Sequence, residues 1–119
     1  MNAELGRKVL DYVTAHREQL DMGDFGRYER CGTVACLAGW TLLLSGYTLT
    51  PDPAFMRPDG SRVHAGPGPG DEAARLLNLT AAEEDGEPGA PWSLFYAGDE
   101  DAAIARFREL VEAAEAGAA

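Results

Sequence analysis

The chain has 119 residues, of which 45% are hydrophobic and 25% are charged, as is usual for a soluble globular domain. Its formal net charge is −10, because 20 acidic residues outnumber 10 basic ones. Such a surface repels phosphate groups, so we expect neither nucleic acid nor an anionic membrane as a partner. Acidity would also fit a nucleic-acid mimic, but solubility explains it more simply. The length predicts a single domain over residues 1–119.

The lack of a secretion signal and the low cysteine content predict a cytoplasmic location. The first residues lack the long apolar run of a secretion signal. The longest uncharged apolar stretch, Val34–Leu44, is shorter than the roughly 20 residues that cross a bilayer. Two cysteines do not make a disulfide framework, so we expect a reducing, cytoplasmic location. Arginine far outnumbers lysine, which favours a GC-rich genome such as an actinobacterial one.

Two helices are predicted in the first half of the chain. Apolar residues at three- and four-residue steps predict a helix from about Asn2 to Leu20, with Asn2 as its cap and His16 on its apolar stripe. Thr33 is expected to cap a second helix that continues to Ser45 and ends at Gly46. This second helix has no charged residue and two apolar faces, so we expect it at the centre of the fold.

Prolines interrupt the helical pattern over residues 47–70, where we expect an irregular loop or excursion. Within it, residues 55–64 are a candidate β-hairpin that turns at Asp59–Gly60. A helix is predicted over Asp71–Leu77. A capping box, Thr80 with Glu83, then predicts another short helix.

The last third of the chain is expected to close the core. The aromatic residues of the segment 92–96 either cover the core or form an exposed partner site, and we favour the core. A final helix is predicted from an Asp99 cap, followed by a frayed tail over residues 116–119. One face of this helix carries Ala103, Ile104, Phe107, Leu110, Val111 and Ala114. The predicted fold is therefore a mainly α, single-domain bundle of four to five helices.

The segment from Cys31 to Trp40 contains both cysteines of the chain and raises the question of thiol chemistry. In the first turn of a helix, Cys36 would lie where the helix dipole favours a thiolate. Cys31 could then act as a resolving thiol, or His64 as a general base. The candidate catalytic residues are thus Cys36, Cys31 and His64. Against this role, Cys36 shares an apolar face with Trp40, and buried cysteines are inert.

Three further interpretations of the same segment remain open. Cys31, Cys36, His16 and His64 are of the types that bind zinc, although their spacing is unusual for a zinc site. The two cysteines could form a disulfide that closes a small loop. In the interpretation that we favour, both cysteines are small apolar side chains that fill the core, and no metal or cofactor is bound.

The segment Cys31-Gly32-Thr33-Val34-Ala35-Cys36-Leu37-Ala38-Gly39-Trp40 resembles a Cys-Gly-Thr-x-x-Cys-x-Ala-Gly pattern in small uncharacterised proteins of bacteria and their phages. The stretch Leu76-Leu77-Asn78-Leu79-Thr80, with Glu83 and later Leu94-Phe95, is similar to a Leu-Gly-Leu-Thr…Leu-Phe element in the same proteins. Asn78 stands where glycine is usual. The resemblance implies no activity.

These observations favour a small acidic accessory or interaction protein without enzymatic activity, whose partner would be a protein. The alternative is a thiol-dependent enzyme or redox protein that uses Cys36 with Cys31 or His64.

Overall fold

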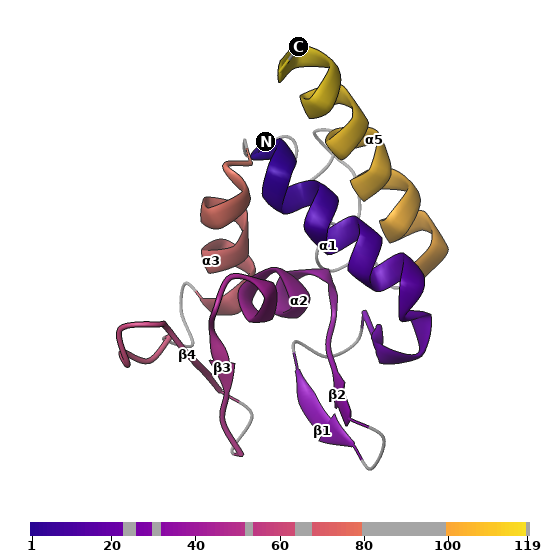
Figure 1. Cartoon of the computed structure of the whole chain (residues 1–119). Coiled ribbons are helices and arrows are strands. Elements are labelled where there is room, and N and C mark those ends of the chain that lie inside the picture. The colour runs from indigo at the N-terminus through magenta and orange to yellow at the C-terminus, as the bar shows by residue number, and fades with distance from the viewer. Residues whose placement is uncertain (23–25, 30–31, 52–53, 64–67, 80–99, 119) are drawn as a thin grey trace, which may run out of the picture.

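A computed structural model describes residues 1–22, 26–29, 32–51, 54–63, 68–79 and 100–118. They form a mainly helical globule, which confirms the predicted fold class at that level (Figure 1). The elements, in chain order, are α1 (Ala3–Ala15), the 3-10 helix η1 (Arg17–Gln19), β1 (Arg27–Glu29), β2 (Gly32–Val34), α2 (Leu37–Leu44), β3 (Thr48–Leu49), β4 (Phe55–Met56), α3 (Gly68–Leu77) and α5 (Glu100–Ala118). None of the helices in these ranges combines the length and apolar character needed to cross a membrane.

Helix α1 is shorter than the sequence predicts. The Asn2 side chain caps it as expected and accepts a hydrogen bond from the Leu5 N–H at 3.1 Å. The helix ends at Ala15, so the predicted end at Leu20 was wrong. The reason is tertiary, because the Gln19 carbonyl accepts hydrogen bonds from Ala35 N at 3.0 Å and Trp40 Nε1 at 2.8 Å.

The segment before α2 is a strand, not the start of a helix. Strand β2 pairs antiparallel with β1, so that Arg27 lies opposite Val34 and Tyr28 opposite Thr33. The prediction that Thr33 caps a helix was therefore wrong. Thr33 and Val34 are β-branched, a type that favours strands, and both lie in the ladder with β1. The N-cap of α2 is Cys36, and its side chain makes no capping hydrogen bond.

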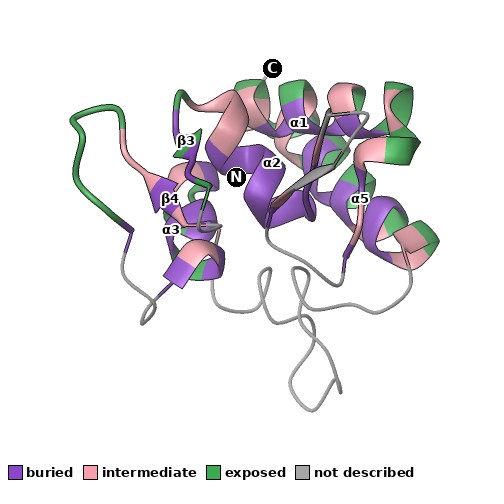
Figure 2. Ribbon diagram, turned by 90° about the horizontal axis from the view of Figure 1, so that it is seen from below, coloured by how far each residue is buried: buried purple, intermediate pink, exposed green. Residues whose placement is uncertain are grey.

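Helix α2 is buried along most of its length. Residues 37–42 are buried, and the helix packs against both α1 and α3 (Figure 2). Its one buried hydroxyl, that of Thr41, donates to the Leu37 carbonyl within the helix at 2.8 Å. The helix ends at Leu44 and is followed by Gly46, which has φ +90° as a left-handed helix terminus requires.

The predicted turn at Asp59–Gly60 is confirmed. The Arg57 N–H donates to the Ser61 carbonyl at 2.7 Å, Gly60 has φ +90°, and Met56 pairs with Arg62. The sequence did not predict β3, which pairs with β4 on its other side. Strand β3 lies between Gly46 and Pro51, and its two residues are too few to show the alternation of apolar and polar residues that predicts a strand.

Helix α3 begins at Gly68, three residues before the predicted Asp71, and ends at Leu77 as predicted. Asn78 follows it with φ +56°, the left-handed conformation that suits glycine or asparagine.

We therefore expect Asn78→Ala to lower the free energy of unfolding by about 1 kcal/mol, because alanine strains a left-handed position. Asn78→Gly should leave it within about 0.5 kcal/mol, since glycine adopts this φ without strain. Urea denaturation of the two variants measures both effects. Equal stability of the two would contradict the assigned conformation.

Helix α5 lies antiparallel to α1 (Figure 1). Ion pairs join α5 to α1 near the end of α5 and to η1 near its start. Arg7 binds Glu115 through two hydrogen bonds, of 2.6 and 3.0 Å, and Arg17 binds Asp101 at 2.9 Å. The predicted apolar face is buried from Ala103 to Val111. The helix extends to Ala118 and so includes residues 116–118 of the segment that the sequence predicts to fray. Thr80, Glu83, the aromatic segment 92–96 and Asp99 lie outside the described residues.

Candidate functional site

The Cys36 thiol belongs to the hydrophobic core. Cys36 is 1% exposed and lies among other buried residues of α2 and α1. It occupies the N-cap of α2 rather than the first turn, three positions earlier in the helix than a cap at Thr33 would place it. Burial in apolar surroundings disfavours a thiolate, which is the nucleophilic form of cysteine. The expected burial of Cys36 is confirmed.

The two other candidate catalytic residues, Cys31 and His64, lie outside the described residues. The possible Cys31–Cys36 disulfide therefore also lies outside the described residues.

The sequence predicts His16 on the apolar stripe of the first helix, but the structure places this residue just after that helix ends. It follows the last turn of α1, is 43% exposed, and its ring contacts that of Tyr12 with 4.5 Å between centroids. Its Nδ1 is 3.8 Å from a Glu18 carboxylate oxygen. Among the described residues, no group of three or more histidine, cysteine, aspartate or glutamate side chains is placed to hold a metal ion.

The Trp40 side chain anchors the cysteine-containing segment to the first helix. Its Nε1 donates to the Gln19 carbonyl, and its ring lies 4.6 Å from that of Tyr12 between centroids. The Tyr12 hydroxyl in turn donates to Gln19 Oε1 at 2.6 Å. Burial raises the pKa of Tyr12. These contacts join α1, η1 and α2, which is a structural role.

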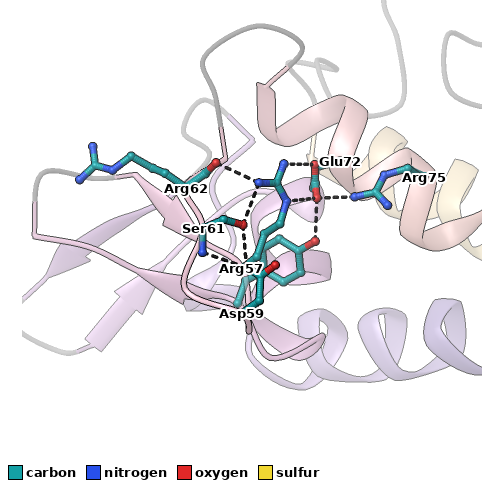
Figure 3. Close-up of polar contacts among 7 residues, drawn as sticks. Arg57, Asp59, Ser61, Arg62, Glu72 and Arg75 are labelled. Atoms are coloured by element: carbon teal, nitrogen blue, oxygen red, sulfur yellow. Dashed lines mark hydrogen bonds and ion pairs between the residues drawn. The ribbon is translucent and has the colours of Figure 1, made fainter.

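A buried carboxylate that sequence reasoning missed lies on α3. Glu72 is only 6% exposed and accepts hydrogen bonds from side chains of three different segments (Figure 3). Arg57, after β4, donates Nε to Oε1 at 2.9 Å and Nη2 to Oε2 at 3.1 Å. The Tyr47 hydroxyl donates to Oε1 at 2.7 Å, and Arg75 donates to the same oxygen. We call these four residues the Glu72 cluster.

The Glu72 cluster holds its carboxylate in the ionised form. The Arg57 guanidinium is the main reason that the pKa of Glu72 falls to about 2, and the Tyr47 hydroxyl adds to the effect against the opposing influence of burial. Burial and the bond to Glu72 raise the pKa of Tyr47. A general acid or base needs a pKa near the working pH, so this carboxylate is suited to a structural role. Arg57 and Glu72 are distant in sequence, and no local pattern pairs them.

An open depression of about 330 Å³ lies at the start of α1, lined by Asn2, Glu4, Leu5 and Lys8. Lys8 Nζ donates to the Leu44 carbonyl at 3.0 Å and thereby joins α1 to the end of α2. Small-molecule sites enclose most of the surface of their ligand, which an open depression does not do.

Comparison of the chain with known protein families, with curated proteins and with solved structures finds no match.

Proposed function

We propose that the chain is a small non-enzymatic accessory protein of the bacterial cytoplasm that binds a protein partner through a basic surface of that partner. The distribution of charge carries this proposal. The chain has a net charge of −10, and within its described part six arginines form ion pairs with the chain's own carboxylates. The paired arginines are Arg7, Arg17, Arg27, Arg57, Arg75 and Arg106.

Because these arginines pair with carboxylates of the chain itself, the excess negative charge lies on the surface. Carboxylates at Glu4, Glu18 and Glu112 are exposed on α1, η1 and α5. Complementary charge steers partners and selects among them, so an acidic surface favours a basic one.

The test is a binding experiment with charge-matched variants. The immobilised chain is exposed to a lysate of the cells that encode it, and the retained protein is identified, purified and titrated calorimetrically against the chain. We expect a defined complex whose affinity falls as salt rises from 50 to 300 mM. The triple variant E4Q/E18Q/E112Q should bind about tenfold more weakly, whereas E4D/E18D/E112D, which keeps the charge, should bind like the native chain. Retention of no protein, or equal binding by both triple variants, would contradict the proposal.

Thiol reactivity separates the proposal from the alternative of a Cys36-dependent enzyme. In a Cys31→Ala variant, we expect iodoacetamide to label Cys36 at least about a hundredfold more slowly than in the urea-unfolded chain, because labelling requires the core to open. Mass spectrometry of timed samples measures both rates. Rapid labelling of the folded protein at neutral pH would favour the enzyme.

A further inference from the structure

Residues 55–63 form a continuous piece of structure that we call the hairpin arm. The arm consists of β4, the turn at Asp59–Gly60 and the returning residues up to Val63. Hydrogen bonds of 2.7 Å from Arg57 N to the Ser61 carbonyl and of 2.9 Å from Val63 N to the Phe55 carbonyl close it on itself. The Asp59 carboxylate accepts from both the N–H and the hydroxyl of Ser61, at 2.8 and 2.6 Å.

The arm is fastened to the rest of the chain by the antiparallel pairing of β4 with β3, by one ionic point and by two apolar side chains. Its Arg57 places two donors on Glu72 of α3 and a third on the Arg62 carbonyl within the arm (Figure 3). Phe55 and Val63 are 2% and 8% exposed. By contrast, α1, α2, α3 and α5 pack on one another through their own contacts. The four helices therefore keep their contacts with one another when the arm opens, although Phe55 and Val63 belong to the same buried core.

We propose that the hairpin arm opens from the helical core as one cooperative segment and that the Glu72 carboxylate is the latch that keeps it closed. Opening breaks the pairing of β4 with β3, exposes Phe55 and Val63, and separates Arg57 from Glu72. The bonds within the arm make its residues open together, as cooperative segments of supersecondary structure do. This device is independent of the protein-binding role proposed above.

Amide hydrogen exchange of the full chain tests the proposal. An isolated hairpin is marginally stable in water, so the amides of Arg57 and Val63 exchange once the arm leaves the core. In the native chain, we expect these amides to be less protected than helical amides of α1. Val111→Ala removes a fully buried side chain of α5. It should accelerate exchange in α1 and α5 about tenfold and leave the arm unchanged, because the arm opens without the helices.

The latch is tested by Glu72→Gln, which should accelerate exchange in the arm about tenfold or more. The matched control is Glu115→Gln, which makes the same charge change and also breaks a two-bonded arginine pair, and should leave the arm unchanged. Arg57→Lys, which keeps the charge but loses the paired donors, should also accelerate amide exchange in the arm. Arm amides as protected as those of α1, acceleration of the arm by Val111→Ala, or unchanged arm rates in Glu72→Gln would each overturn the proposal.

Discussion

Phe107→Ala is expected to lower the free energy of unfolding by about 4 kcal/mol, the largest effect that we predict for a single substitution. Phe107 is fully buried on α5, within the apolar face that packs against the rest of the core. Truncation removes its apolar contacts and leaves a cavity that the close-packed helices fill only in part. Urea denaturation measures the loss as a lower midpoint at unchanged slope.

The neighbouring Arg108→Ala is the control, because Arg108 is exposed on the same helix. It should change the free energy of unfolding by no more than about 0.5 kcal/mol. A loss below about 1 kcal/mol for Phe107→Ala would mean that α5 is not an integral part of the core.

Glu72→Gln is expected to lower the free energy of unfolding by about 3 kcal/mol at pH 7, because it leaves the Arg57 guanidinium facing a neutral group in a largely buried position. The effect also depends on pH. The pKa of Glu72 is about 2 in the folded chain and 4.5 in its unperturbed state. Stability from this depressed pKa is fully present above about pH 4.5 and is lost as the pH falls toward 2.

The native chain should therefore lose stability more steeply than Glu72→Gln between pH 5 and pH 2, so that the two curves converge in acid. Denaturation in urea at a series of pH values measures both curves. Glu115→Gln serves as the control, since its arginine pair is more exposed and screened by solvent. Its effect at pH 7 should be much smaller. Parallel curves for the native chain and Glu72→Gln would contradict the assigned ionisation.

The sequence was informative where a local pattern matched the final structure. Asn2 supplies the side-chain oxygen that caps α1, and the turn at Asp59–Gly60 forms where the dipeptide predicts it. The buried face of α5 follows the apolar period from Ala103 to Val111. The burial of Cys36 also followed from its apolar neighbours. In each case, the residues that determine the feature lie within one or two turns of each other.

Predictions failed where distant parts of the chain compete for the same backbone groups. The Gln19 carbonyl is bonded to Ala35 and Trp40, so α1 ends before it and the segment before Cys36 is extended rather than helical. Thr33 lies in a paired strand, so its side-chain oxygen has no helix terminus to cap. Such competition is decided by the free energy of the whole fold, which local propensity describes only weakly.

The amino-acid sequence by itself determined the acidic character of the chain, its mainly α class, and the apolar character of the segment around Cys36. Only the tertiary structure decided that this segment enters α2 from a strand and that Glu72 accepts hydrogen bonds from Tyr47 and Arg57. The physical reason is how far apart in the sequence the interacting residues lie. Composition is visible in the sequence itself, and a helical period depends on residues only a few positions apart. A buried carboxylate, by contrast, is stable only when folding brings its distant partners within hydrogen-bond distance.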